Sequence, residues 1–288
     1  MTRFLYTFLT VLVFQMSLFS QEDLLDELEE EVATIPTSTI EDAAFKALKI
    51  VNFESTKVTN KGDLYFIVAH RFGSVQNAFE DLFGLDNAVT KLGFRYGFTD
   101  WLELGLARSS RQANYGLHAK YKLVSQKKDG FPLNIVGFNL LTINTLLDSN
   151  ALPGLEFNNR LNYTSQLLIS HKFNKNFSFQ LAPSIVHQNL VEVDEQDNTQ
   201  FILGSGARLK ISKRVSINAD YGWHLIRADN SPFSHSLSIG FDIETGGHVF
   251  QLHFTNAQPL LDDGFLVEGN GDWGDGVFFF GFNLNRVF

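Results

Sequence analysis

The strongest constraint on this chain is a two-residue alternation of apolar and polar side chains from about residue 62 to the C-terminus. Successive side chains of a β-strand point to opposite faces, so each alternating run has one apolar and one polar face. Twelve runs of strand length follow this pattern, near residues 63–72, 89–97, 101–108, 115–123, 131–144, 159–173, 177–187, 200–210, 215–224, 234–243, 248–256 and 277–288. The pattern predicts an all-β protein.

Two of the twelve runs are irregular. The first, LYFIVAHRF, is apolar on both faces. The fifth changes the phase of its alternation near Val136, which predicts a β-bulge there.

The connections favour a transmembrane barrel. Short turns alternate with long loops, and an even number of strands joined in this way is typical of outer-membrane barrels. The polar faces are rich in Gly, Ser, Asn and Gln, whereas water-exposed faces of a sandwich would carry more Lys, Glu and Thr. Because hydrocarbon leaves no backbone group unpaired, a spanning sheet must close. We predict an antiparallel transmembrane β-barrel of about 12 strands, with short periplasmic turns and longer acidic extracellular loops. The alternative is a secreted β-sandwich.

The region before the strands divides into two parts. Residues 1–20 place Arg3 before an apolar run, as in a cleavable signal peptide, and the alternative is a membrane anchor. Residues 21–60 are predicted as an acidic N-terminal periplasmic segment or a plug, and the acidic start of this segment either binds a partner or is a solvated linker. Within it, residues 44–53 are predicted as an extra strand or a plug. The barrel domain is then 61–288.

Composition excludes several classes of protein. The 288 residues contain no Cys, which excludes disulfides, a Cys-based zinc site, a thiol nucleophile and a lipoprotein anchor. The formal charge of −9 argues against a nucleic-acid partner.

The C-terminal run ends on a phenylalanine. Its apolar face carries Phe280, Phe282, Leu284 and Phe288, and this resembles the terminal-strand signal read by the barrel-assembly machinery of Gram-negative bacteria. Residues 63–73, 83–110, 241–258 and 271–288 resemble a family of uncharacterised outer-membrane β-barrels, a domain of unknown function. The stretch ETGGHVFQLHFTN is the most specific part. The resemblance implies a fold and a location, but no substrate, reaction or catalytic residue.

Charged and imidazole side chains fall on the predicted inner face. The lumen-lining candidates are Lys91, Arg95, Glu103, His118, Lys120, Lys122, Arg208, Lys210, Asp220, Asp242 and His253. Glu103 lies between the strands of Arg95 and Lys120, where cross-strand pairing is expected. These residues form either a charged, selective pore or a paired network that holds the barrel closed.

Specific chemistry is sparse. The final long loop contains GNGDWGDG, in which Asp272 and Asp275 are candidate calcium ligands, although the spacing is not that of an EF-hand. The alternative there is a solvated acidic loop. No other cofactor is expected. A lipid-acting enzyme could use the pairs His224 with Ser234 or His235 with Ser236, but spacing alone does not identify a catalytic triad.

The sequence therefore predicts a non-enzymatic outer-membrane channel or transporter for ions or small solutes. The alternatives are a structural or adhesive barrel and a lipid-acting enzyme. The expected partners are outer-membrane lipid, lipopolysaccharide, the barrel-assembly machinery and a periplasmic partner of the acidic N-terminal segment.

Overall fold

The computed structural model describes residues 40–41, 43–77, 84–191, 193–227 and 230–288. Contacts divide the chain into a unit of residues 1–40 and a unit of residues 41–288. Only Ile40 of the first unit is described, so the predicted signal peptide and the acidic stretch up to residue 39 lie outside the described residues.

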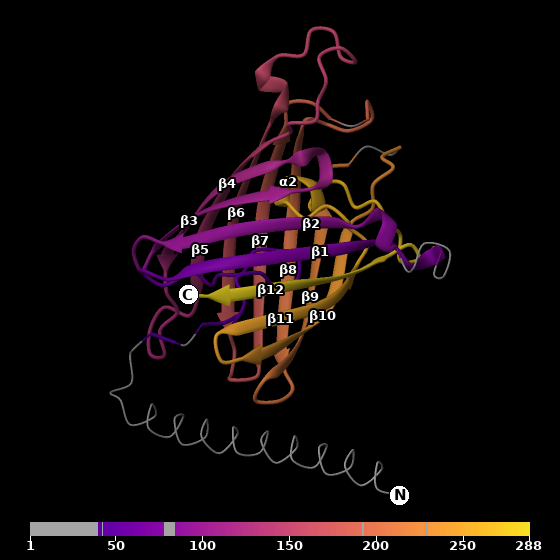
Figure 1. Cartoon of the computed structure of the whole chain (residues 1–288). Coiled ribbons are helices and arrows are strands. Elements are labelled where there is room, and N and C mark those ends of the chain that lie inside the picture. Colours follow the sequence, from indigo (N-terminus) through magenta and orange to yellow (C-terminus); the bar gives the residue numbers. More distant parts are fainter. Residues whose placement is uncertain (1–39, 42, 78–83, 192, 228–229) are drawn as a thin grey trace, which may run out of the picture. The chain divides into compact units, whose positions relative to one another are not determined.

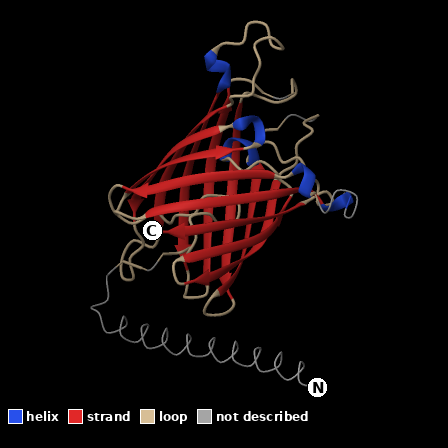
Figure 2. Ribbon diagram, in the orientation of Figure 1, coloured by secondary structure: helices blue, strands red, loops and turns tan. Residues whose placement is uncertain are grey.

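Twelve antiparallel strands close into a barrel (Figures 1 and 2). Each strand pairs with the next, and β1 closes on β12 with Tyr65 opposite Val287. The strands are β1 Leu64–Ser74, β2 Val89–Gly97, β3 Leu102–Ser109, β4 Tyr115–Val124, β5 Asn134–Ile143, β6 Leu161–Lys172, β7 Phe177–Gln188, β8 Thr199–Lys210, β9 Val215–His224, β10 Ser236–Thr245, β11 His248–Thr255 and β12 Phe279–Val287. The predicted barrel is confirmed, and the sandwich alternative is wrong.

Short helices interrupt the connections. They are η1 Val75–Asn77, η2 Leu85–Asn87, η3 Arg111–Ala113, η4 Phe157–Arg160 and α2 Asp262–Phe265. Within the described residues, no helix is long and apolar enough to cross a membrane. We call the two ends of the barrel the short-turn end, where β2 turns into β3, and the long-loop end, where β11 leads to β12.

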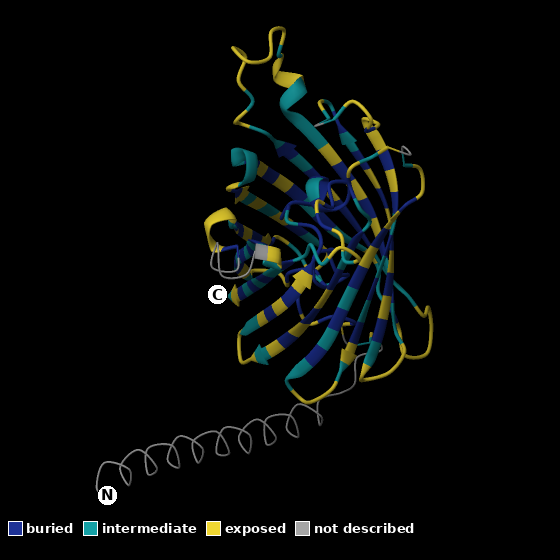
Figure 3. Cartoon of the chain, turned by 90° about the vertical axis from the view of Figure 1, so that its right-hand side faces the viewer, coloured by how far each residue is buried: buried dark blue, intermediate teal, exposed yellow. Residues whose placement is uncertain are grey.

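The two faces of each strand differ sharply in burial (Figure 3). Along β2, Leu92 and Phe94 are exposed on the outside while Lys91 and Arg95 are buried inside. Near the short-turn end, Phe98, Trp101 and Phe173 are more than half exposed, as expected of an aromatic girdle at a lipid–water boundary. The apolar outer surface is therefore suited to lipid.

The predicted phase change in the fifth strand is wrong. Val136, Phe138 and Leu140 all face inward and are buried, so side chains alternate between the two faces without a change of phase. Unlike in most other strands, these inward residues are apolar. The irregularity lies in β4, where Lys122 pairs with Val136 and Val124 pairs with Ile135. β5 is apolar on its inner face because that face contacts chain inside the barrel.

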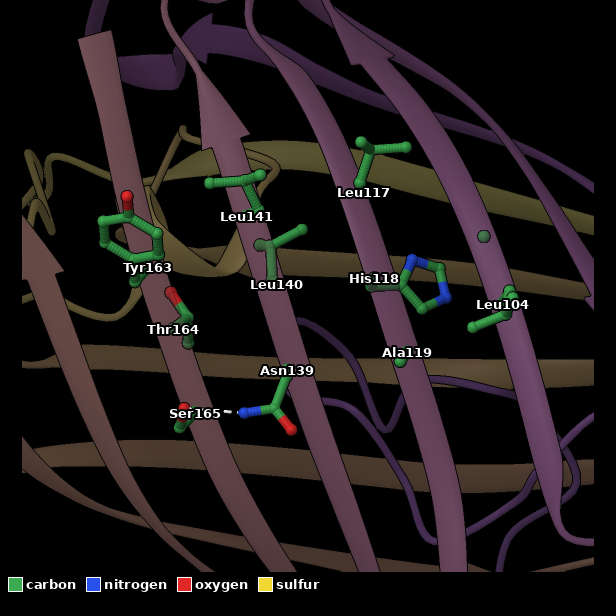
Figure 4. Close-up of a pocket in the computed structure, with 11 residues that line it drawn as sticks. Leu104, Leu117, His118, Ala119, Asn139, Leu140, Leu141, Tyr163, Thr164 and Ser165 are labelled. Atoms are coloured by element: carbon green, nitrogen blue, oxygen red, sulfur yellow. Dashed lines mark hydrogen bonds between the residues drawn. The ribbon is translucent and has the colours of Figure 1, made fainter. Parts of the chain in front are cut away.

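The outer face of β5 is small and polar only near its middle, at Gly137 and Asn139. Figure 4 shows Asn139 directed at Ser165 on β6, and the Asn139 amide donates a 2.7 Å hydrogen bond to the Ser165 hydroxyl. The Tyr121 hydroxyl donates to the side-chain carbonyl oxygen of Asn139 at 3.0 Å. A hollow of about 460 Å³ lies here, bordered by Leu104 and Leu117. Mutual hydrogen bonds reduce the cost of polar groups on this apolar wall.

Two segments fill the lumen. The plug segment, residues 43–60, enters from the short-turn end, and the inserted loop, residues 256–268, enters from the long-loop end and contains α2. Wall glycines make room for the plug segment. A Cβ on Gly204 would lie 2.2 Å from the Phe53 ring, and one on Gly206 would lie 2.4 Å from Ile50. Any larger residue at these two wall positions would require the Phe53 ring or the Ile50 side chain to move.

The assignment of faces can be tested with Leu106→Arg. Leu106 is exposed on the outer face near the middle of β3, so the charge should lower the free energy of unfolding by about 2–4 kcal/mol in a bilayer. The control, Leu209→Arg at the end of β8, should cost about 0–1 kcal/mol because the guanidinium reaches the interface. Urea unfolding from lipid vesicles measures both values. Equal costs would contradict the assignment.

Candidate functional site

The centre of the lumen is occupied by a tight hairpin of the plug segment. Ile50 donates its backbone N–H to Phe53 at 2.8 Å, and Ser55 donates to Leu48 at 3.0 Å. These bonds fold residues 48–55 back on themselves, so the tip of the hairpin projects its backbone N–H groups away from its own strands. The tip therefore needs an acceptor supplied by the barrel wall.

Asp220 of β9 is that acceptor. One of its carboxylate oxygens, Oδ2, receives the backbone N–H groups of Val51, Asn52 and Phe53 at 3.0, 2.7 and 3.0 Å. Successive N–H groups of a turn form a concave site that suits an anion. A single wall carboxylate therefore fixes the position of the plug tip.

Glu54, next to the tip, is the centre of a buried ion cluster. Arg95 donates two hydrogen bonds to its carboxylate at 2.6 and 2.7 Å, and Lys120 and Lys49 each lie 3.0 Å away. The Glu54 side chain is fully buried. Burial alone would raise its pKa, but Arg95, Lys49 and Lys120 together hold the pKa well below its usual value. Glu54 is therefore ionised and ties the plug segment to β2 and β4.

A second buried carboxylate, Glu103 of β3, joins the same cluster. Its oxygens lie 3.2 Å from Arg95 and 3.3 Å from His118, and they accept the backbone N–H and the hydroxyl of Thr59 at 2.8 and 2.6 Å. The predicted pairing of Glu103 with Arg95 is present. Lys120, the other predicted partner, lies opposite Glu103 in the register of β3 and β4, but its ammonium donates to Glu54 and to the Leu48 carbonyl of the plug segment.

The plug segment and the inserted loop meet inside the barrel. Lys49 forms a 3.0 Å ion pair with Asp262, and the rings of Phe53 and Phe265 pack edge to face with centroids 5.3 Å apart. A cavity between the two segments, lined in part by Lys91, measures about 20 Å³, which suffices for only one or two waters. The two segments therefore close the lumen at this level.

The other predicted lumen residues also face inward. Lys91 donates to the Leu260 carbonyl at 2.9 Å, Arg208 pairs with Glu244 at 2.7 Å, and Asp242 accepts from Gln251 at 2.8 Å. The buried His253 ring makes no hydrogen bond within the described part of the chain. Lys122 and Lys210 are half-buried near the short-turn end.

Sequence reasoning missed several members of this site. The sequence predicts Lys49 only as part of an extra strand or plug and makes no prediction for Glu54 directly after it, although both are isolated charges in the apolar run KIVNFE. Arg71 of β1 was not singled out, yet it is buried and donates to Asn52 and Asn283. Charges within an apolar stretch are the signal that would have found them.

The predicted solvated acidic loop is only partly correct. Asp262, Asp263 and Glu268 are buried in the lumen, because the inserted loop packs against the plug segment and the wall. Asp272 and Asp275 are exposed, and the Asp272 carboxylate accepts the Gly274 backbone N–H at 2.6 Å. Among the residues that the structure describes, no three acidic or imidazole groups are placed to hold a metal ion. Calcium at Asp272 and Asp275 gains no support from this geometry.

The Ser–His pairs are not arranged as hydrogen-bonded dyads. His224 donates from Nε2 to the Leu266 carbonyl at 2.6 Å, and its backbone N–H bonds to His235. The Ser236 hydroxyl is buried and has no hydrogen-bond partner among the described residues, and Ser234 pairs through its backbone with Gly269. His224 therefore anchors the inserted loop.

The predicted assembly signal lies on the outside of the closing strand. Phe280, Phe282 and Leu284 alternate with inward residues along β12, and Phe288 is 64 % exposed. The Arg286 guanidinium lies 4.6 Å from the centre of the Phe288 ring. Recognition of this strand by the assembly machinery stays a prediction.

Comparison with known proteins gives a family and distant structural likenesses. The family described as "Membrane bound beta barrel domain (DUF5777)" matches residues 45–288. No curated protein is significantly similar in sequence. The KdgM porin is 9 % identical with a TM-score of 0.47, covering 78 % of this chain and 99 % of that one. The Acinetobacter baumannii outer membrane protein Omp33 is 10 % identical with a TM-score of 0.43, covering 79 % and 99 %.

Glu54→Gln tests the ion cluster. Removing the plug carboxylate leaves the buried Lys120 without a carboxylate partner among the described residues and takes one of two carboxylates from each of Arg95 and Lys49, which should lower the free energy of unfolding by about 3–5 kcal/mol. Urea unfolding gives this value, and cleavage by added protease reports release of the plug segment. Glu41→Gln is the matched control, because its ion pair with Lys172 is partly exposed and should contribute only about 0–1 kcal/mol. Equal effects of the two substitutions would refute the central role of Glu54.

Proposed function

The chain belongs to the family of membrane-bound β-barrel domains, and on that premise we propose that it is an outer-membrane channel for ions or small solutes, closed in this conformation by its own plug segment and inserted loop. A cleavable signal peptide at residues 1–20 and export to the outer membrane are part of this proposal. No catalytic step is included in it.

One observation carries the proposal: polar and ionic contacts connect the plug segment to a wall that is complete without it. Every strand of the barrel pairs only with neighbouring wall strands, so the plug contributes nothing to closure of the sheet. The wall groups that hold it, Arg95, Glu103, Lys120 and Asp220, are polar. Water can replace such contacts when the plug leaves, whereas an apolar wall would exclude it.

The energetics of buried charges point the same way. Replacing a buried ion cluster with apolar residues of similar volume is often neutral or stabilising. A barrel whose lumen stays permanently filled therefore gains little from Glu54 and its three cations. A wall that must accept water after the plug is released does require charged and polar side chains.

The second candidate is a structural or adhesive barrel without transport. It is favoured by the apolar part of the filling, where Val136, Phe138 and Leu140 of β5 cluster with Phe53 and Phe265. Such contacts resist separation because exposing them to water is unfavourable. A barrel of this kind would carry no ion current.

The acidic segment of residues 21–39 precedes the plug segment in the chain. We assign a periplasmic partner to this segment as part of the proposal. Such a partner would act on the plug directly, because the two are covalently continuous. The other proposed partners are outer-membrane lipid, lipopolysaccharide and the barrel-assembly machinery.

A disulfide that locks the plug segment tests the proposal. The hydroxyls of Thr56 and Ser170 of β6 are 2.6 Å apart, and the chain has no natural Cys, so Thr56→Cys with Ser170→Cys places one cross-link between plug and wall. In planar bilayers, the reduced protein should show discrete ion currents and the oxidised protein should show none. Adding reductant to the oxidised protein should restore the current.

The matched control links two wall strands. His187 of β7 and Thr199 of β8 are 2.7 Å apart on the outside, so His187→Cys with Thr199→Cys leaves the plug free and should conduct in both redox states. Absence of current from the wild-type chain at every voltage would refute the channel and favour the structural barrel. Equal currents from the oxidised and reduced Thr56–Ser170 variant would refute closure by the plug.

A further inference from the structure

The carboxylate of Glu54 is held mostly by the barrel wall. Arg95 of β2 donates to both of its oxygens, at 2.6 and 2.7 Å, and Lys120 of β4 donates to one of them at 3.0 Å. The remaining contact, from Lys49 at 3.0 Å, comes from the plug segment itself. A guanidinium that meets both oxygens in this forked way recognises the shape as well as the charge of a carboxylate. The wall therefore carries most of a carboxylate-binding site.

Departure of the plug segment would leave these wall cations with too little negative charge. Both hydrogen bonds that the structure gives the Lys120 ammonium, to Glu54 and to the Leu48 carbonyl at 3.2 Å, go to the plug segment. Arg95 would keep only Glu103, which lies 3.2 Å away. Glu103 also lies opposite Lys120 in the register of β3 and β4, so its single charge would have to serve both cations. One positive charge would then lack a carboxylate partner.

The surrounding wall adds to this excess of positive charge. Among the buried, inward-facing residues of β1 to β4 that the structure describes, Glu103 is the one acidic residue. The buried arginine and lysine residues on the same inner face are Arg71, Lys91, Arg95 and Lys120. The buried wall carboxylates Asp220 and Asp242 lie on β9 and β10, which the strand order places across the barrel from β3 and β4. An anion in an open lumen is therefore attracted to the side of β2 to β4.

We propose that Arg95 and Lys120 bind the carboxylate group of an anionic solute in the open barrel, and that Glu54 occupies this site in the closed barrel. The inference rests on the proposed channel function and adds the class of solute to it. A free carboxylate has the charge and planar shape of the Glu54 head group, so it can accept the same hydrogen bonds after the plug segment has left. A neutral solute would leave the cations unpaired. The open channel therefore passes anions in preference to cations.

The site is tested first on the full chain, without any measurement of current. Glu54→Ala removes the plug carboxylate and leaves room for acetate beside Arg95 and Lys120. Acetate, compared with chloride at the same ionic strength during refolding and heating, should raise the midpoint of thermal unfolding of this variant, because a ligand of the folded state stabilises it. Acetamide has the same shape without the charge and should have no effect. Folding that occurs only in acetate would report the same binding.

Three control proteins show whether the acetate effect belongs to this site. The wild-type chain should show no shift, since Glu54 already fills the site. Adding Lys120→Gln to Glu54→Ala should weaken the shift, because it removes one of the two wall cations. Glu41→Ala removes a carboxylate whose partner, Lys172, is partly exposed, and it should show no acetate effect.

Ion selectivity in planar bilayers tests the role of the site in the open channel. Under a gradient of potassium chloride, the wild-type chain should have a ratio of chloride to potassium permeability above one. Lys120→Gln should fold, because Glu54 keeps Arg95 and Lys49, and it should lower this ratio. Arg108→Gln is the matched control: Arg108 is exposed on the outer face of β3, so its loss should leave the ratio unchanged.

The outcomes separate this inference from the channel on which it rests. Absence of an acetate effect on Glu54→Ala would overturn the carboxylate site even if the barrel conducts. A current that prefers potassium, or a permeability ratio that Lys120→Gln leaves unchanged, would overturn the inference and leave the channel proposal standing. Absence of any current would refute the channel itself, and an acetate effect would then assign the site a structural role only, which overturns the inference as well.

Discussion

Pairing of every strand edge is the constraint on which the rest of this structure depends. A sheet surrounded by hydrocarbon cannot leave a row of N–H and C=O groups unpaired, and β1 meets this demand by pairing with β12 over most of its length. Once the sheet is closed, each strand has one face toward lipid and one toward the lumen. The outer face therefore becomes apolar, and the charged and hydrogen-bonding side chains lie mainly on the inner face.

The inner face is not left to water in this conformation. The plug segment and the inserted loop enter from opposite ends and meet at the ion pair of Lys49 with Asp262. Gly204 and Gly206 leave space for Phe53 and Ile50, so the wall and the filling have complementary shapes. The filling is therefore part of the folded barrel, and a solute would have to displace it.

Two kinds of contact hold the plug segment and the inserted loop in the lumen, and they have opposite effects on opening of the lumen. On the side of β5, Phe138 and Leu140 contact apolar side chains of both inserted segments, which favours a closed state. On the side of β2 to β4, Glu54 and Glu103 organise basic side chains that water could solvate. The balance between the two sides is the physical basis for distinguishing a gated channel from a structural barrel.

The sequence by itself determined the number of strands, the side on which most residues lie and the barrel, because alternation with a period of two is a local property of the chain. It also placed Arg95 and Glu103 on adjacent strands, which follows from short turns. The tertiary structure alone decided that the lumen is filled. The partners of Glu54 are 41 and 66 residues away, and Lys49 meets Asp262 across 213 residues. A pattern that repeats every two residues carries no information about contacts between residues so far apart in the sequence. The same reason explains the error at β5: its inward apolar residues interrupt the expected pattern because they pack against segments that enter the barrel from both ends.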